Sequence, residues 1–332
     1  MLRLDRRTLL TGALTAVSSA ALSPAPASAA ASFQGDARVI AETVAGPRLL
    51  DLTIASPALG TAVTTRLFLP RGWTPDPSRT WPVLYLLHGA LDDHTGWTRN
   101  SDVASLAEQA HVLVVMPDGG RAGFYSDWWN FGRGGTPAWE RFHLVELRRI
   151  LERSYGAGPR RAVAGLSMGG FGALSYAARH PRMFRAAASF SGMVHTTYKG
   201  PHAPSPWDGP GAVQNLFRSE NLDPDILWGD PITERRRWAA HCPYDLAHQL
   251  RDIPVYLSCG NGQPGPLDPP GTSPDTSLEP LLDIMNRLLA QQLRRLGGDV
   301  TEHFYGPGIH NWPYWQRELH ASFPLLMSSI WA

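Results

Sequence analysis

Three side chains of this 332-residue chain have the types and the order needed for nucleophilic catalysis. Ser167 lies between two glycines in Gly165-Leu-Ser-Met-Gly169, acidic residues follow it, and His310 lies in Gly308-Ile-His-Asn-Trp312. A serine hydroxyl becomes a nucleophile when an imidazole removes its proton and a carboxylate holds that imidazole in the right tautomer. The chain order serine, acid, histidine indicates acyl transfer through a serine ester.

The segments on either side of Ser167 make a weak pattern specific. Gly-x-Ser-x-Gly alone carries little information in a chain with 32 glycines. Here a short apolar strand, Ala162-Val-Ala164, precedes the serine, and a run of small residues typical of a helix, Gly169–Leu174, follows it. A strand, a tight turn and a helix in this order predict a strained turn that lifts the serine Oγ above the sheet.

The candidate base is His310, one of twelve histidines. It follows the last predicted strand in a loop held by glycines, from which an imidazole can reach the serine, whereas a histidine on a helix face such as His143 cannot. The residues alone leave the acid open, because several carboxylates lie between the last two predicted strands. The four candidates are Glu279, Asp268, Asp275 and Asp283.

The negatively charged oxygen of a tetrahedral intermediate needs backbone N–H donors. The sequence predicts one at Met168, directly after the nucleophile, and another at Ala90 or Leu91, in the loop after the strand Val83–Leu87. Aromatic side chains crowd the same predicted face. These side chains would suit contact with an acyl chain or a sugar ring. The equally weighted alternative is that most of them belong to the buried core. These residues are Trp97, Phe124, Tyr125, Trp128, Trp129, Trp312 and Trp315.

The elements that must position these residues alternate between strands and helices, which predicts an α/β fold with a mostly parallel central sheet and helices on both faces. Two Pro- and Gly-rich stretches, 195–230 and 260–276, follow strand ends and are predicted to be a lid or binding loops. Predicted strands cover 49–54, 62–69, 83–87, 112–116, 161–164, 185–190, 254–258 and 302–305. Predicted helices cover 101–109, 139–155, 171–179 and 278–296.

The first thirty residues have the features of a targeting segment. Arg6-Arg7 precedes an apolar, Ala-rich run, Leu9–Leu22, and Ala27-Ser-Ala29 offers a cleavage site. We expect residues 1–30 to be a cleaved twin-arginine signal, since the apolar run is too short for a membrane anchor. We expect residues 31–332 to be one exported domain, since no later segment is long and apolar enough to span a bilayer. A formal net charge of +1 gives no indication of a nucleic-acid partner.

The two cysteines, Cys242 and Cys259, could pair in an exported protein or could be small buried residues. Neither has cysteines or histidines around it at a spacing typical of a metal site. The sequence therefore predicts neither a metal nor a cofactor.

With these residues in view, the chain resembles the esterase D-like α/β-hydrolases and is most similar to the secreted mycolyltransferases of the antigen 85 group. The resemblance implies an α/β-hydrolase fold. It also favours Glu279 as the acid, because Leu278-Glu279 followed by Gly297-Gly298 fits the family's register, and it points to His88, Leu91, Asp127 and Trp312 as substrate contacts. The resemblance rests on four runs of sequence that occur in the family's order and at similar spacing between Val83 and Trp315. These runs are Phe124-Tyr-Ser-Asp-Trp128, Gly165-Leu-Ser-Met-Gly169, Ser258-Cys-Gly-Asn-Gly262 and His310-Asn-Trp-Pro-Tyr-Trp315.

The departures from that family concern its sugar acceptor. The mycolyltransferases carry an aspartate where this chain has His88, and an arginine that is absent from the shorter run Ala90-Leu-Asp-Asp93. A cysteine pair of several members is replaced by Phe131-Gly-Arg-Gly-Gly135. The sequence thus predicts a secreted serine esterase for small-molecule or lipid acyl esters. The alternatives are an acyltransferase to a sugar or lipid hydroxyl and a binding protein without catalysis, and the complete triad argues against the last.

Overall fold

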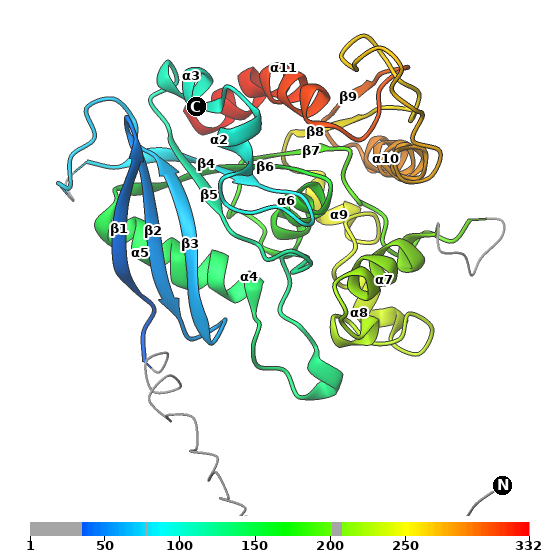
Figure 1. Ribbon diagram of the computed structural model, residues 1–332, viewed down its shortest axis with the longest axis horizontal. Helices are drawn as coiled ribbons and strands as arrows, with labels where there is room; N and C mark the ends of the chain where they lie inside the picture. Colours follow the sequence, from blue (N-terminus) through cyan, green and yellow to red (C-terminus); the bar gives the residue numbers. More distant parts are fainter. Residues whose placement is uncertain (1–34, 77–78, 201–207, 332) are drawn as a thin grey trace, which may run out of the picture.

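The computed structural model describes residues 35–76, 79–200 and 208–331, so the predicted signal at 1–30 lies outside the described residues. Its strands form one nine-stranded sheet in the order β1-β2-β3-β5-β4-β6-β7-β8-β9 (Figure 1). The strands are β1 (Arg38–Gly46), β2 (Leu49–Ser56), β3 (Thr61–Phe68), β4 (Trp81–Leu87), β5 (Leu113–Pro117), β6 (Ala157–Leu166), β7 (Ala186–Phe190), β8 (Val255–Cys259) and β9 (Val300–Phe304).

The sheet has an antiparallel edge and a parallel body. β1, β2, β3 and β5 pair antiparallel in sequence order, whereas every pair from β5 through β4, β6, β7 and β8 to β9 is parallel. Parallel strands end at the same edge of a sheet, so the loops after β4, β6, β7, β8 and β9 are brought together there. The predicted α/β-hydrolase architecture is confirmed.

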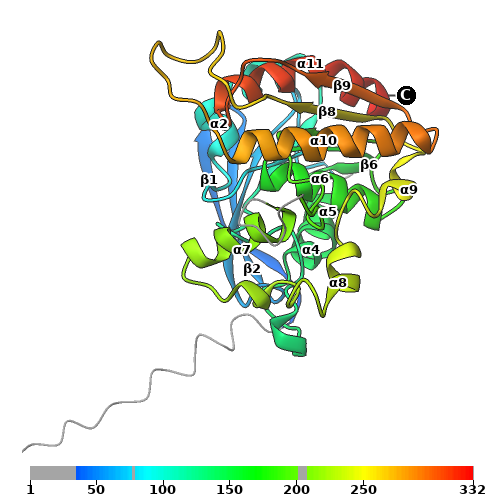
Figure 2. The same cartoon turned by 90° about the vertical axis from the view of Figure 1, so that its right-hand side faces the viewer.

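Helices cover both faces of the sheet, and each face has its own core. Leu84 and Leu86 of β4 belong to the core beneath α11, whereas Val83, Tyr85 and Leu87 belong to the opposite core, beneath α6. Residues alternate between faces because a strand has a period of two. Figures 1 and 2 show α11 on one side of the sheet and α5 and α6 on the other. The helices near the site are α2 (Gly96–Asn100), α3 (Val103–Glu108), α5 (Arg148–Ser154), α6 (Met168–Arg179), α10 (Leu278–Arg295) and α11 (Trp312–Trp331).

Several elements differ from the sequence prediction. The C-terminal helix α11 was not predicted, and it buries Leu319, Leu326 and Ile330 against the sheet. The stretch 195–230, predicted as irregular, contains α7 (Gly209–Ser219), which has Pro210 in its first turn and is capped by the Asp208 carboxylate. The predicted helix 139–155 is present as one continuous helical segment, in which a π-helical stretch, Phe142–Leu147, joins α4 (Trp139–Arg141) to α5.

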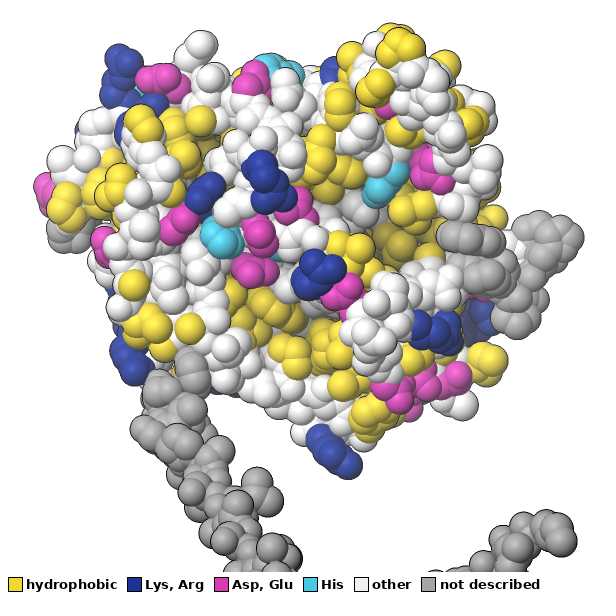
Figure 3. Space-filling model, viewed as in Figure 1, with side chains coloured by type: hydrophobic (Ala, Val, Ile, Leu, Met, Phe, Trp, Pro, Cys, Tyr) yellow, Lys and Arg dark blue, Asp and Glu magenta, His cyan; other side chains and the backbone are white. Residues whose placement is uncertain are grey.

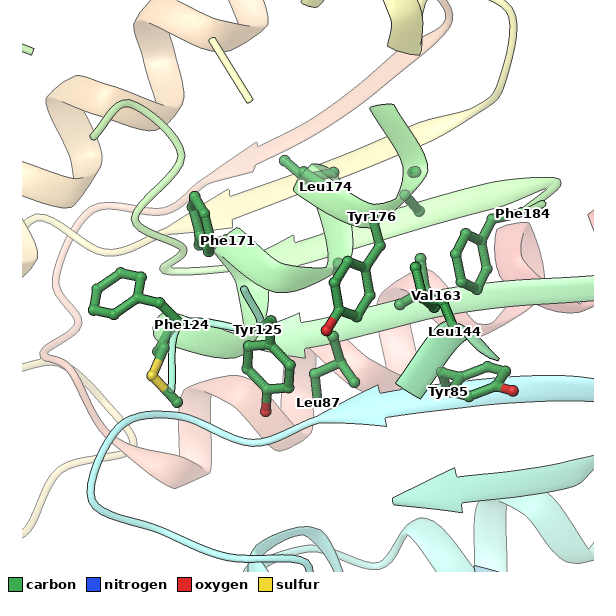
Figure 4. Packing of buried hydrophobic residues seen from close by; sticks show 14 of the residues in the cluster. Tyr85, Leu87, Phe124, Tyr125, Leu144, Val163, Phe171, Leu174, Tyr176 and Phe184 are labelled. Carbon is green, nitrogen blue, oxygen red and sulfur yellow. The ribbon is translucent and has the colours of Figure 1, made fainter. Parts of the chain in front are cut away.

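The loop after β5 is anchored in the core by two aromatic side chains. Phe124 packs edge-on against Phe171 of α6, and Tyr125 packs edge-on against Tyr176, with ring centroids 5.4 and 6.0 Å apart (Figure 4). The Tyr125 hydroxyl also donates to the His88 carbonyl at 2.8 Å. These contacts fix the loop after β4 relative to the helix that follows Ser167.

Candidate active site

Ser167 stands at the sharp turn between β6 and α6. Its backbone has φ +53° and ψ −119°, a conformation that L-residues rarely adopt. Its N–H donates to the Phe190 carbonyl of β7 at 2.9 Å, and its carbonyl accepts from Phe171 at 3.1 Å, so the surrounding backbone maintains the strained geometry. The predicted strand–turn–helix around Ser167 is therefore present.

The two glycines of the motif are required by close packing. A Cβ on Gly165 would lie 2.3 Å from the Gly169 carbonyl oxygen, and a Cβ on Gly169 would lie 2.3 Å from the Leu87 carbonyl oxygen. No side chain fits at such distances without moving backbone. The turn thus brings the end of β6 directly against the end of β4.

His310 and Glu279 are joined by a short hydrogen bond. His310, in the loop between β9 and α11, places Nδ1 2.6 Å from Oε2 of Glu279, in the first turn of α10. The Glu279 side chain is fully buried. An imidazole bonded to a carboxylate through Nδ1 leaves Nε2 for proton exchange with a nucleophile. Ser167 and His310 line one cavity, and among the described residues no hydrogen bond joins them, as is common before substrate binds.

The other three candidate acids have structural partners instead. Asp275 accepts backbone N–H groups at the start of α10, including that of Glu279 at 2.9 Å. Burial opposes ionisation of Asp275, but these donors and nearby His310 lower its pKa overall. Asp268 accepts from Gly265 N–H and the Tyr314 hydroxyl, and Asp283 pairs with exposed Arg287.

The second oxygen of Glu279 is held by donors that directly follow two strands, β7 and β8. Its Oε1 accepts the Ser191 hydroxyl at 2.7 Å and the Gly260 N–H at 2.8 Å. Ser191 follows β7 with φ +46°, and its Oγ in turn accepts the Trp315 indole N–H at 3.2 Å. A buried carboxylate needs such donors to remain charged. Sequence reasoning missed Ser191, because nothing local to it indicates a contact 88 residues away.

The backbone leaves two N–H groups free at the predicted oxyanion position. Met168 is the first residue of α6, where an amide has no partner within the helix. In the described part of the chain the Ala90 amide likewise donates to no backbone or side-chain acceptor, whereas that of Leu91 donates to the Arg121 carbonyl at 2.9 Å. Of the two candidates in this loop, Ala90 therefore fits the role better.

Two of the predicted substrate contacts, His88 and Asp127, do not line the cavity. His88 is buried behind the loop, where Nε2 accepts the Gly119 N–H at 2.8 Å, so Nδ1 carries the proton and donates to the Gly89 carbonyl at 2.7 Å. Asp127 accepts the Arg141 N–H at 3.0 Å, and burial raises its pKa. Both residues support the backbone around the site.

The cavity around Ser167 has a volume of about 300 Å³. Leu91 and Trp312, both predicted as substrate contacts, line it. So does Arg99 of α2, which the sequence did not single out and whose guanidinium lies 2.6 Å from Asp92. The full lining is Gly89, Ala90, Leu91, Asp92, Arg99, Leu166, Ser167, His310, Asn311, Trp312 and Trp315.

The predicted aromatic wall is divided between cavity and core. Trp312 and Trp315 line the cavity, and Trp315 packs edge-on against the His310 imidazole with centroids 4.8 Å apart. Trp97, Phe124 and Tyr125 are fully buried and belong to the core. Both cysteines are free and buried, and burial near Glu279 raises the pKa of Cys259 well above its usual value.

On the face seen in Figure 3, lysine and arginine side chains are scattered rather than gathered into one patch. This distribution agrees with the near-neutral sequence, and the absence of a nucleic-acid partner stays a prediction. Within the ranges that the structure describes, no helix is long and apolar enough to cross a membrane.

A family model with the description "Putative esterase" matches residues 56–326. The chain belongs to this esterase family. It is therefore an enzyme of ester hydrolysis or acyl transfer. The resemblance to the antigen 85 group is confirmed as well.

Two similar relatives carry the name of a mycolyltransferase. This esterase is 31% identical over 263 residues to the diacylglycerol acyltransferase/mycolyltransferase Ag85B of Mycobacterium avium, covering 76% of each chain. It is 34% identical over 255 residues to the protein of the same name from Mycolicibacterium smegmatis, covering 73% of this chain and 75% of the relative.

Solved structures show the same fold at lower identity. MPT51 of Mycobacterium tuberculosis superposes with a TM-score of 0.67 at 24% identity, over 86% of this chain and 100% of MPT51. An S-formylglutathione hydrolase from Agrobacterium tumefaciens superposes with a TM-score of 0.67 at 16% identity, over 88% of this chain and 99% of the hydrolase.

Proposed function

We propose that this protein is an exported serine esterase that hydrolyses carboxylic acyl esters through an acyl-enzyme on Ser167. The observation that carries the proposal is the 2.6 Å contact between His310 Nδ1 and Glu279 Oε2 at a cavity that also contains the strained Ser167. A buried carboxylate, an imidazole and a serine on a strand-to-helix turn form the arrangement that ester hydrolysis through a serine needs.

In the first half-reaction, Ser167 Oγ attacks the acyl carbonyl carbon while His310 Nε2 takes the hydroxyl proton. The carbonyl oxygen becomes negative and is stabilised by the Ala90 and Met168 N–H groups and by the positive end of α6. When the intermediate collapses, its C–O bond to the alcohol breaks, and His310 returns the proton to the leaving alcohol.

In the second half-reaction, water attacks the Ser167 ester, and His310 accepts one of its protons. The second intermediate releases the carboxylic acid and restores the Ser167 hydroxyl. Glu279 remains charged throughout and stabilises the imidazolium that forms in each half. No metal or cofactor enters these steps.

The cavity supports a short or medium acyl chain as the substrate. Its volume of about 300 Å³ is at the lower end of the range for small-molecule sites, about 300–1,000 Å³. Leu91, Leu166 and Trp312 give it apolar surface, whereas Asp92 and Arg99 make its rim polar. We infer that the acyl group lies against the apolar residues and the alcohol part lies toward the rim.

The proposal places the enzyme outside the cytoplasm. The twin arginine, the apolar run Leu9–Leu22 and the Ala27-Ser-Ala29 site support export with removal of the first residues. Size analysis of the protein secreted by its native host, with the N-terminal sequence of that product, tests this part. A mature N-terminus at Ala30 or Ala31 supports it, and a cytoplasmic full-length product contradicts it.

The second candidate function is acyl transfer to a sugar or lipid hydroxyl. The names of the Ag85B relatives, which include acyltransferase and mycolyltransferase, favour it. The Arg99–Asp92 pair at the cavity rim also offers hydrogen-bonding groups to an acceptor hydroxyl. Chemically the two functions differ in whether water or an alcohol attacks the Ser167 ester.

Product analysis by mass spectrometry separates the two functions. The mature protein is incubated with a medium-chain acyl ester, with and without trehalose or glucose, and Ser167→Ala is the control. We expect free acid alone, and none with the variant. Acyl sugar formed at the expense of free acid would show the transferase instead, and equal product from Ser167→Ala would refute both.

A further inference from the structure

A second cluster of reactive side chains lies outside the catalytic cavity. His195 follows β7, and Cys242 and Asp245 lie between α8 (Arg235–Ala239) and α9 (Ala247–Leu250). A ring nitrogen of His195, Cys242 Sγ and a carboxylate oxygen of Asp245 all lie within 4.8 Å of one another. None of these three residues takes part in the proposed ester chemistry.

The cluster has the dimensions of a small metal site. Ideal tetrahedral zinc, with Zn–N of about 2.0 Å and Zn–S of about 2.3 Å, separates nitrogen from sulfur by about 3.5 Å. Here Nδ1 and Sγ are 3.8 Å apart. The Thr197 hydroxyl lies among the three ligands, 3.2 Å from Nδ1, 3.5 Å from Sγ and 2.6 Å from Asp245 Oδ2. The ligand atoms therefore surround a common point.

Burial and packing hold two of the ligands in place. Cys242 is fully buried and His195 is 9% exposed. The His195 ring stacks on Tyr244, with centroids 3.7 Å apart and an angle of 12° between planes, and this contact fixes its orientation. Asp245 is exposed, so its side chain can turn toward the centre and leaves a path for an ion from solvent.

We propose that His195, Cys242 and Asp245 form a binding site for a thiophilic divalent cation of the zinc type. Imidazole, thiolate and one carboxylate match the ligand preference of zinc, and three protein ligands leave a fourth position for water. On binding, the Cys242 thiol loses its proton to solvent and the sulfur–metal bond forms. The Thr197 hydroxyl moves away from the centre and is not a ligand.

The bound ion would join the segment around His195, which contacts the backbone of Ser167, to the segment around Cys242. Val194, next to His195, already accepts the Tyr244 N–H at 3.0 Å, and Met193 N–H donates to the Ser167 carbonyl at 3.4 Å. A cation on His195 and Cys242 cross-links these segments. Zinc at a hundredfold excess over its dissociation constant is expected to shift the unfolding equilibrium by about a hundredfold toward the folded state.

Cobalt is the direct probe, because a thiolate ligand gives Co²⁺ a charge-transfer absorption that nitrogen and oxygen ligands do not. The chelator-treated mature protein is titrated with Co²⁺ and then with Zn²⁺. We expect one equivalent of Co²⁺, a thiolate band, and displacement by Zn²⁺. Absence of stoichiometric binding, or binding without the band, would overturn the proposal.

Matched variants locate the site. Cys242→Ser is expected to lose the band, whereas Cys259→Ser keeps it, because Cys259 Sγ lies beside Glu279. Asp245→Asn, a surface change that does not threaten folding, is expected to weaken Co²⁺ binding by more than about tenfold, the loss typical of removing even an outer-shell partner.

Thr197→Val separates a metal site from a cluster held by hydrogen bonds alone. The proposal predicts that this variant binds Co²⁺ at least as tightly as the wild type. An unchanged band in Cys242→Ser, unchanged affinity in Asp245→Asn, or loss of binding in Thr197→Val would each contradict it. Thermal unfolding of each variant without metal checks that it is folded.

Discussion

The two walls of the catalytic cavity are held in very different ways. The acid wall, defined as His310 and Trp315 in the cavity lining with Glu279 and Ser191 buried behind them, is connected by hydrogen bonds from the residues that follow β7 and β8 and from α11, and its carboxylate is fully buried. The rim wall, defined as Leu91, Asp92 and Arg99, is formed by the loop after β4 and by α2. Leu91 is 48% exposed, and about half of the Arg99 side chain is exposed.

This difference assigns separate tasks to the two walls. A buried, fully hydrogen-bonded carboxylate is preorganised, so it can stabilise the charge on His310 without reorganisation. An exposed ion pair contributes little to stability and can change its partners. We infer that the acid wall determines the chemistry, whereas the rim wall determines which alcohol is accepted or released. The predictions below test that separation.

The largest effect is expected in the acid wall, at Glu279. Glu279→Gln keeps the size of the side chain but removes its charge, so His310 loses control of its tautomer and of its imidazolium form. We expect kcat for ester hydrolysis to fall by about 10³- to 10⁴-fold, as when the acid of a serine triad is neutralised. Steady-state kinetics on a chromogenic short-chain ester measures this.

Asp283→Asn is the matched control on the same helix, since Asp283 pairs with exposed Arg287 and lies outside the cavity. It should remain close to wild-type activity. Comparable losses in the two variants would mean that Glu279 is not the acid and that the acid wall is wrongly assigned.

A smaller effect concerns His143, a buried histidine that packs beside Tyr125 and Tyr176 outside both walls. His143 bonds the Tyr176 hydroxyl and the Asp118 carbonyl, and burial lowers its pKa to about 4. An unfolded histidine has a pKa of about 6.5, so between these values the unfolded chain binds a proton that the folded protein does not. Stability is therefore complete above pH 6.5 and falls as the pH drops toward 4.

From pH 7 to pH 5 this one group should remove about 2 kcal/mol from the free energy of unfolding. Urea titrations at both pH values measure it. In His143→Gln the loss on acidification should be smaller than in the wild type by about that amount. An identical pH dependence in the two proteins would show that His143 is not kept neutral by burial.

Ser191 tests whether the acid wall works as a unit. Ser191→Ala removes one donor to Glu279 and leaves the Gly260 N–H and His310. A hydrogen bond to a charged group is worth about 1.5–3 kcal/mol, so we expect kcat to fall by about ten- to a hundredfold with KM nearly unchanged. A change confined to KM would place Ser191 in substrate binding instead.

The smallest effect on hydrolysis is expected in the rim wall. Arg99→Gln removes an exposed ion pair, so hydrolysis of a short ester should change by less than about threefold. The ratio of transfer to hydrolysis with an added alcohol should change more. Arg287→Gln, equally exposed and outside the cavity, is the control. A large loss of hydrolysis in Arg99→Gln alone would remove the distinction between the walls.

The same contrast explains what the sequence could predict. The strand–turn–helix around Ser167 is encoded within a dozen residues, so its geometry follows from local pattern. The residues alone left Glu279 as one of four candidate acids, because the choice among these acids depends on contacts with the residues that follow β7 and β9. The family register then favoured Glu279. The parallel order of the strands followed from alternating strands and helices.

Features that depend on distant contacts could not be predicted. Arg99 reaches the cavity because α2 folds back over the loop after β4, and Ser191 meets Glu279 across 88 residues of sequence. His195 and Cys242 are 47 residues apart, so their spacing gave no indication of a metal site. His88 has the type of an active-site residue, and only its buried partners assign it to the support of the loop.

The central claim is that Ser167 carries the acyl group during turnover. The most direct measurement mixes the mature protein with a p-nitrophenyl ester, quenches the reaction within milliseconds at low pH, and determines the mass of the intact protein and of its peptides. The account predicts one added acyl group, on the peptide that contains Ser167, and none in Ser167→Ala. An acyl group on another residue, or the same adduct in the variant, would contradict it.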